Sequence, residues 1–141
     1  MTDLKVRLVR RPSPRLLKGI ITLYRSHGWW KPGDTAAGLR ASIAGSHCFA
    51  VAVSGGRVIG IGRAISDGAS DAYIQDMAVL PEARSGGVGT ALLKALMHRL
   101  RQDGITWVAL IAQDNSAYFY RKSGFRTLKR AHPMLSAKTY V

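Results

Sequence analysis

Apolar and polar residues alternate along the chain with two different periods, which predict both strands and helices. Residues 4–10 (LKVRLVR) alternate as in a half-buried strand, and apolar side chains at helical spacing predict a helix over residues 16–27. The segment GWWKPGD interrupts this pattern. Asp34 is expected to cap a second, short helix that runs through Ile43.

Three strand-like runs follow these helices, at residues 47–54, 58–66 and 72–80. The first two are separated by Gly55-Gly56-Arg57, a composition typical of a tight hairpin. Both runs are therefore expected to pair in antiparallel fashion.

A strong amphipathic helix is predicted after the third run. Val88, Leu92, Leu96 and Leu100 recur every four residues, and the pattern ends near Gly104. The apolar run at residues 105–112 then predicts a strand buried on both faces.

The last part of the chain predicts one more helix and two closing strands. Asn115 is expected to start a helix that continues through Lys122 and stops at Gly124. Residues 125–129 and 134–141 are expected to form the strands. A strand–helix–strand unit needs parallel pairing while the hairpins need antiparallel pairing, so the predicted class is mixed α/β.

Length and composition predict one soluble-type domain that covers residues 1–141. Apolar residues make up 47% of the chain and charged residues 21%, and no apolar run approaches the ~20 residues of a membrane span. The N-terminus has no apolar core of signal-peptide type, and Cys48 is the single cysteine. Both features predict a cytoplasmic protein without a disulfide, in which Cys48 fills the core.

The net charge of +13, from 21 basic and 8 acidic residues, predicts attraction to polyanions. Nucleic acid is one such partner. However, the basic residues are scattered from Lys5 to Lys138, without a basic run interleaved with aromatics, so nucleic acid is not the favoured partner. A phosphate-rich small cofactor explains the charge equally well. No metal is predicted.

The loop Arg84-Ser85-Gly86-Gly87-Val88-Gly89-Thr90 lies between a predicted strand and a predicted helix. The first turn of a helix has unpaired N–H groups and a partial positive charge, and glycines let a phosphate approach them. A nucleotide P-loop needs a lysine after the last glycine, and Thr90 stands there. A dinucleotide fingerprint needs glycine or alanine where Leu92 stands.

What fits is Arg-x-x-Gly-x-Gly, formed by Arg84, Gly87 and Gly89, with the second motif Tyr-Phe-Tyr-x-x-x-Gly-Phe at residues 118–125. Together these motifs resemble the GNAT family, the GCN5-related N-acetyltransferases, and the resemblance covers essentially the whole chain. It implies an α/β GNAT fold with a mixed central sheet of about six to seven strands and about four helices. Two stretches, LYRSHGW and IGRAISDG, are loosely similar to small members related to arylalkylamine acetyltransferases.

The resemblance implies acetyl-coenzyme A as co-substrate. Its diphosphate would bind the loop Arg84, Ser85, Gly86, Gly87, Val88, Gly89 and Thr90. Its pantetheine would pair with Met77, Ala78 and Val79, in a gap opened by a bulge in the strand 74–79, and with Asn115. One strand amide would polarise the acetyl carbonyl. Arg121 and Lys122 could add positive charge for the phosphates, and the alternative for them is a solvated surface role. The alternative for Asn115 is that it caps a helix.

Acetyl transfer also needs an acid for the departing thiolate and a base for the ammonium. By the same resemblance Tyr120 is the acid, since a phenol with a reference pKa of about 10 keeps its proton at neutral pH. The alternative is simple aromatic packing. Asp76 is the candidate base or water-positioning group, against a substrate contact or an ordinary surface acid, and its facing is left open by the bulge. Glu82 is badly placed, and His132 is a further candidate.

The acceptor is expected between the first two helices. Tyr24, Trp29, Trp30 and Tyr73 would line its site and favour an aromatic or apolar primary amine, whereas the alternative for the tryptophans is a core-anchoring role. The leading hypothesis is acetylation of a small amine by direct attack in a ternary complex. Two alternatives stay open: an acetyltransferase for protein N-termini or lysines, with an open groove, and a coenzyme A- or nucleic-acid-binding module without turnover. A homodimer built through the last strands is a further expectation.

Overall fold

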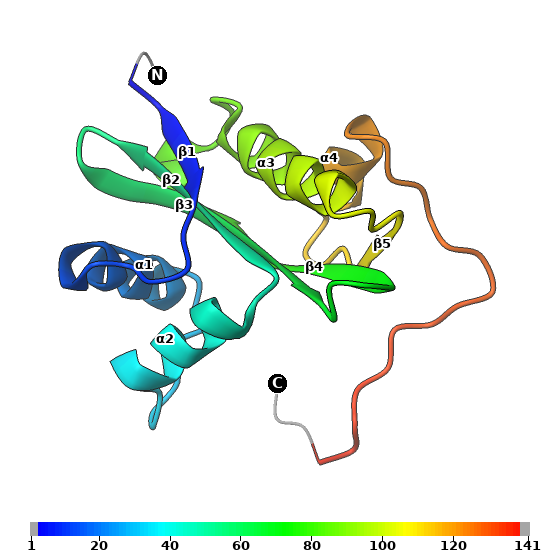
Figure 1. The fold of residues 1–141 in the computed structure, drawn as a ribbon, viewed down its shortest axis with the longest axis horizontal. Coiled ribbons are helices and arrows are strands. Elements are labelled where there is room, and N and C mark those ends of the chain that lie inside the picture. The colour runs from blue at the N-terminus through cyan, green and yellow to red at the C-terminus, as the bar shows by residue number, and fades with distance from the viewer. Residues whose placement is uncertain (1–2, 139–141) are drawn as a thin grey trace. The chain divides into compact units, whose positions relative to one another are not determined.

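The computed structural model describes residues 3–138, which form two compact units that divide after Leu110. The first unit contains most of the regular structure (Figure 1). Its elements are β1 (Lys5–Leu8), α1 (Pro14–Ser26), α2 (Ala36–Gly45), β2 (Cys48–Ser54), β3 (Arg57–Ser66), β4 (Asp71–Val79), η1 (Pro81–Ala83), α3 (Val88–Gln102) and β5 (Trp107–Leu110). The second unit contains α4 (Ala117–Lys122). The single domain expected over residues 1–141 stays a prediction.

The five strands form one mixed sheet in the order β1-β2-β3-β4-β5. The first four strands pair in antiparallel fashion. β4 and β5 are parallel because α3 returns the chain to the end of the sheet at which β4 begins. The predicted mixed α/β class is confirmed. The number of strands among the described residues is five, lower than the six to seven expected.

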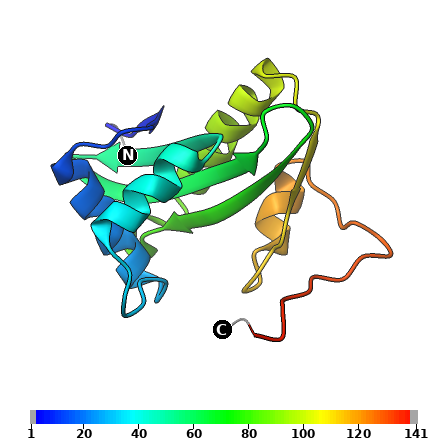
Figure 2. The same ribbon diagram turned by 60° about the horizontal axis from the view of Figure 1, so that its bottom comes forward.

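Helices cover both faces of this sheet. Helices α1 and α2 lie on one face and α3 lies on the other (Figures 1 and 2). α1 buries the apolar stripe that the sequence predicts, and α3 buries the residues of its four-residue repeat. The largest fully buried side chains come from both layers: Phe49, Ile20, Leu23, Ile43, Ile61, Leu92, Leu96, Leu100, Ile105, Val51 and Val88.

Helix α3 packs closely on β3 because β3 has a glycine at the contact. A Cβ atom on Gly60 would lie 2.9 Å from Leu92 Cδ1 and 3.0 Å from Val88 Cγ1. A real Cβ atom hardly ever comes this close to its neighbours, so a larger residue would require the Leu92 and Val88 side chains to shift. Gly60 therefore allows α3 to pack closely on β3.

The predicted hairpin between β2 and β3 is confirmed. Gly55 and Gly56 have φ angles of 57° and 75°, and the flanking residues Ser54 and Arg57 pair across the turn. Two consecutive positive φ angles match the twist of a two-residue hairpin, and glycine adopts them without a steric cost.

The start of α2 differs from the prediction. Thr35, not Asp34, is the N-cap, and its hydroxyl accepts the Gly38 N–H at 3.0 Å. Asp34 instead accepts the backbone N–H of Lys31 at 2.7 Å, which closes the turn before the helix. Both residue types are good caps, so the choice between neighbours depended on how the Lys31–Asp34 turn folds.

Two expectations about the C-terminal part of the first unit and the following turn are wrong. The run at 105–112 yields only a four-residue strand, and Trp107 is exposed in it rather than buried. Asn115 does not start α4, because it has a φ of 63° in a turn and Ser116 is the N-cap. The predicted end of α4 is confirmed, since Gly124 follows it with a φ of 98°.

The closing strands are also not found among the described residues. Residues 125–129 and 134–138 are irregular, and the remaining expected strand residues, 139–141, lie outside the described part of the chain. Leu128, Met134 and Leu135 are exposed, so no apolar face of these segments is buried in a strand layer.

Candidate active site

A bulge in β4 is the central feature of the candidate site. Gln75 pairs with Arg63 and Ala78 pairs with Ile61, so Asp76 and Met77 together face the single residue Gly62. Asp76 has a φ of 54°, the left-handed conformation that residues other than glycine rarely adopt. The bulge that the family resemblance implied is therefore present. Because of the extra residue, the side chains after the bulge face the side of the sheet opposite to the one that simple alternation from the residues before it would give.

The bulge turns Asp76 towards α1, which settles the facing that the sequence left open. Its Oδ2 atom accepts two hydrogen bonds of 2.8 Å, one from the Tyr24 hydroxyl and one from Arg63 Nε. The Asp76 side chain is 26% exposed, and no hydrogen bond from the described residues reaches its Oδ1 atom. One carboxylate oxygen is thus held by the protein and the other is available to a ligand.

Tyr24 and Arg63 hold this carboxylate in different ways. Burial, followed by the charge of Asp76, raises the pKa of Tyr24 well above its usual value, so its hydroxyl remains a donor at any physiological pH. Arg63 contributes the compensating charge and also lies near Gln75. Sequence reasoning missed Arg63. Its pairing position, opposite the strand that carries Asp76, becomes recognisable only when the β3–β4 register is known.

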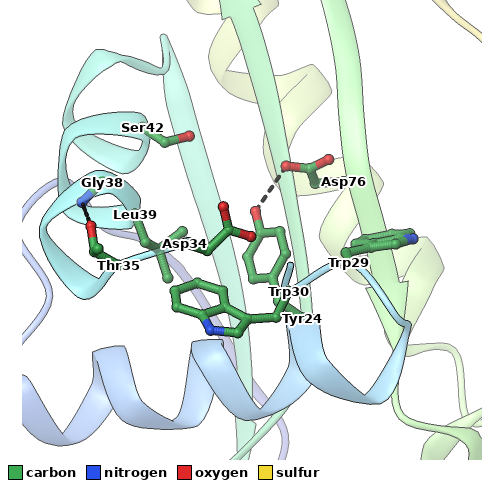
Figure 3. A pocket seen from close by; sticks show the side chains of 9 residues that line it. All are labelled: Tyr24, Trp29, Trp30, Asp34, Thr35, Gly38, Leu39, Ser42 and Asp76. Atoms are coloured by element: carbon green, nitrogen blue, oxygen red, sulfur yellow. Dashed lines mark hydrogen bonds between the residues drawn. The ribbon is translucent and has the colours of Figure 1, made fainter. Parts of the chain in front are cut away.

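A small pocket opens beside Asp76, between α1, α2 and β4 (Figure 3). Its volume is about 190 Å³, and it is lined by Tyr24, Trp29, Trp30, Asp34, Thr35, Gly38, Leu39, Ser42 and Asp76. The structure thus brings together four residues that the sequence assigned to catalysis or acceptor binding: Tyr24, Trp29, Trp30 and Asp76.

Both tryptophans belong to the pocket wall rather than to the core. Trp29 is 37% exposed and packs edge-on against Tyr24, with ring centroids 6.0 Å apart. Trp30 carries the Arg25 guanidinium 5.8 Å from its ring centroid. Tyr73, by contrast, is not among the lining residues. It is 47% exposed and packs edge-on against Trp107 of β5 at 5.8 Å.

The N-terminus of α3 fits a bulky anion. Gly87 is the N-cap with a φ of 80°, no side chain caps the helix, and its first turn has no acidic residue. Within the described part of the chain, none of the backbone N–H groups of residues 86–90 donates to another backbone group, and the first intrahelical donor is Ala91, which bonds Gly87 O. These unpaired N–H groups and the helix dipole suit the two phosphates of a diphosphate.

Arg84 connects this loop to both neighbouring elements. Its Nε donates to the Val79 carbonyl at 3.3 Å, and its Nη2 lies 3.4 Å from His27 Nε2 at the end of α1. The ring of His27 lies 5.1 Å from that of Trp29. The glycine-rich loop at residues 84–90 and the wall of the pocket are therefore linked through two side chains, Arg84 and His27.

The free edge of β4 lies between the two features. The parallel ladder with β5 ends at the pair Ile74 and Leu110. Beyond the bulge, Leu80 N–H bonds Ile59 O of β3, so alternation places the N–H and C=O of Val79 on the opposite edge. The contact of Arg84 with the Val79 carbonyl agrees with that facing. Val79 N–H is thus open to a ligand that lies along this edge.

The remaining predicted residues belong to the second unit. Tyr120 is buried, with its ring 4.9 Å from Phe119 and 5.9 Å from Phe125, and burial raises its pKa above the usual value of 10. Its hydroxyl therefore keeps its proton throughout the neutral range. Asn115 is exposed in the turn before α4. The roles of Tyr120, Asn115 and His132 stay predictions.

Other types of site have little support in the described residues. Cys48 is buried, and burial raises the pKa of its thiol to about 11, as expected for a core residue rather than a nucleophile. Residues 3–138 contain no group of three or more histidine, cysteine or acidic side chains placed to hold a metal ion. In the same residues, no helix has the length and apolarity needed to cross a membrane.

Comparison with known proteins agrees with this geometry. The model of the acetyltransferase (GNAT) domain matches residues 45–127, which include β4, the bulge and the glycine-rich loop before α3. A GNAT family acetyltransferase from Streptococcus pneumoniae has the same fold, with a TM-score of 0.79 and 24% identity over 94% of this chain and 96% of that chain. The chain belongs to the GNAT family of N-acetyltransferases.

Curated relatives share about half of the chain. A serotonin N-acetyltransferase 2 of Oryza sativa is 36% identical over 72 residues, which is 51% of this chain and 36% of the relative. A histone acetyltransferase, TAP1 of Glycine max, is 41% identical over 69 residues, which is 49% of this chain and 30% of the relative. The chain thus covers only about a third of the length of these relatives, whose named substrates differ.

Proposed function

We propose that this protein is an acetyl-coenzyme A-dependent N-acetyltransferase that acetylates a small primary amine by direct attack within a ternary complex. One observation carries the proposal: a single strand, β4, connects an anion-binding helix N-terminus to a carboxylate-bearing pocket. Residues 86–90 would hold the diphosphate of the donor, and Val79 N–H would face the thioester carbonyl. Both groups are backbone donors, as oxyanion and phosphate sites often use.

The chain's own residues would manage two protons. The amine nitrogen bonds to the acetyl carbon, and the bond from that carbon to sulfur breaks. Asp76, with Oδ2 held by Tyr24 and Arg63, offers Oδ1 to the incoming ammonium and takes its proton directly or through water. Tyr120 gives its proton to the departing thiolate, since burial keeps its hydroxyl protonated. The acylated nitrogen then releases its second proton, which passes through water to the Tyr120 oxygen and restores the hydroxyl.

The size of the pocket and the net charge of the whole chain support a small acceptor over a polypeptide. About 190 Å³ is below the roughly 300 Å³ at which drug-sized sites begin. A net charge of +13 disfavours basic peptide tails at long range. A protein substrate is kept as the alternative because one relative is named a histone acetyltransferase.

The test is a thiol-release screen with acetyl-coenzyme A against alkyl and aryl amines, polyamines, amino acids and basic peptides. Amine-dependent release above background hydrolysis is expected for small amines. Release with peptides alone would favour the alternative, and calorimetry that detects no heat with acetyl-coenzyme A at millimolar concentration would overturn the proposal. A cytoplasmic location and a homodimer remain separate proposals, to be tested by localisation of the tagged full protein and by light scattering.

A further inference from the structure

Two of the few acidic residues of this basic chain line the same pocket. The chain has 8 acidic residues against 21 basic ones, yet Asp34 and Asp76 both line this pocket. No lysine or arginine is among the described residues that line it. The pocket is therefore an acidic site on a strongly basic protein. Its local negative charge favours a cationic ligand although the rest of the surface repels cations.

The two carboxylates are not equivalent. Asp76 already forms an ion pair with Arg63, so much of its charge is compensated within the protein. Asp34 accepts only the Lys31 backbone N–H through Oδ2, and it takes part in none of the ion pairs of the described residues. Its charge is thus available to a cation in the pocket.

The rest of the wall suits a short apolar chain that bears a cation. Tyr24, Trp29 and Trp30 present aromatic surface, and aromatic faces attract ammonium and guanidinium groups. Trp30 already has the Arg25 guanidinium 5.8 Å from its ring centroid. Figure 3 shows that Asp34 and Asp76 reach the pocket from different elements, the former from the turn before α2 and the latter from β4.

We infer that the acceptor is a short aliphatic diamine, bound with one nitrogen at Asp76 and the other, still protonated, at Asp34. This inference rests on the proposed function. The reacting nitrogen loses one proton at Asp76, bonds to the acetyl carbon as the thiolate leaves, and then releases its second proton to water. The second nitrogen, with a reference pKa of about 10.4 for an alkyl amine, stays charged and is recognised by Asp34. A monoamine of equal length lacks that second contact.

The experiment compares 1,4-diaminobutane, butylamine and 2-phenylethylamine as acceptors for the wild-type protein and for Asp34→Asn. Asparagine can still accept the Lys31 N–H, so the turn is preserved while the charge is removed. We expect kcat/KM for the diamine to exceed that for butylamine by about fivefold, the scale of an exposed ion pair. This preference should disappear in Asp34→Asn, because kcat/KM for the diamine falls more than kcat/KM for butylamine, and it should shrink in high salt.

The matched control is Asp71→Asn, which removes one exposed carboxylate at the start of β4 and outside the pocket. It should retain the diamine preference. Equal kcat/KM for diamine and butylamine, a preference for 2-phenylethylamine, or an unchanged preference in Asp34→Asn would each overturn the inference while leaving the proposed acetyltransferase activity intact.

A binding measurement covers the case in which no amine is acetylated, which would refute the proposed function. Two of the three tryptophans, Trp29 and Trp30, line the pocket, so ligand binding should change the intrinsic fluorescence. Tighter binding of 1,4-diaminobutane than of butylamine to the wild type, lost in Asp34→Asn, supports diamine recognition independently of turnover. Equal binding of both amines contradicts it.

Discussion

The Tyr24 hydroxyl donates a 2.8 Å hydrogen bond to Asp76 Oδ2 across 52 residues of sequence, and it thereby joins the first helix to the bulge of β4. Arg63 donates to the same oxygen from the neighbouring strand. Two elements therefore fix one carboxylate at the wall of the pocket, and the contribution of each can be measured separately.

Tyr24→Phe should lower both stability and activity. The loss of a partly buried hydrogen bond to a charged acceptor is expected to cost about 1–2 kcal/mol in the free energy of unfolding. Asp76 would then be held by Arg63 alone, so kcat should also fall. Urea denaturation and steady-state kinetics test both effects. Tyr118→Phe is the control, because Tyr118 is 69% exposed and its hydroxyl makes no hydrogen bond within the described residues. Equal effects of both variants would contradict a specific role for Tyr24.

Asp76→Asn tests the carboxylate itself. If Asp76 takes the proton of the amine, kcat/KM should fall by about 100-fold or more at neutral pH, the usual contribution of a general base. The loss should fall on kcat, while acetyl-coenzyme A affinity should stay unchanged. A higher KM for the amine with an unchanged kcat would assign Asp76 to acceptor positioning instead.

Tyr120→Phe separates proton donation from donor binding. Turnover should fall by about 100-fold, whereas the affinity for acetyl-coenzyme A should change little. Because burial raises the pKa of Tyr120 above 10, ionisation of this group should not limit the wild-type rate at neutral or mildly alkaline pH. Tyr118→Phe again provides the matched loss of a hydroxyl on α4. Wild-type turnover in Tyr120→Phe would remove it as the acid.

Gly89→Glu places a bulky anion among the donors of the α3 N-terminus. Acetyl-coenzyme A binding should become undetectable by calorimetry, because the carboxylate occupies and repels the diphosphate position. The fold should not be weakened, since an acidic residue in the first turn of a helix stabilises it by about 0.3–1 kcal/mol. Gly45→Glu, at the end of α2 with open space around the added side chain, is the control for charge alone. Retained affinity in Gly89→Glu would exclude residues 86–90 as the anion site.

The ion pairs of Asp103 predict a pH dependence of stability. The side chains of His47 and Arg99 donate to its Oδ2 at 2.7 and 3.0 Å, and the bond from His47, followed by that from Arg99, holds the Asp103 pKa below its usual value of 3.8. A carboxyl group whose pKa is lower in the folded than in the unfolded protein stabilises the fold at pH values above its unfolded pKa. This stabilisation is lost as the pH falls through the folded pKa. Asp103→Asn should therefore lower the Tm by about 2 °C at pH 7. The difference from wild type should shrink as the pH falls below 3.8 and should vanish below the lowered pKa of folded Asp103, and a constant difference would contradict the linkage.

Features that depend on adjacent residues could be predicted from the sequence alone. The Gly55-Gly56 turn, the α3 repeat and the glycine-rich loop at its N-terminus are local, because backbone freedom and helical periodicity act within a few residues. Predictions failed where neighbours compete for one role or where burial decides the outcome. Asp34 and Thr35 are both able caps, and residues 105–112 are apolar but leave Trp107 exposed.

The sequence by itself determined the mixed α/β class, the order of the main elements and the position of the glycine-rich loop before α3, since each follows from short-range pattern and composition. Only the tertiary structure decided which way Asp76 faces, that Arg63 is its partner, and that Asp34 shares its pocket while Tyr73 does not. The physical reason is the register of β3 against β4. A one-residue bulge changes which face each side chain occupies, and such a shift depends on pairing between strands rather than on either strand alone.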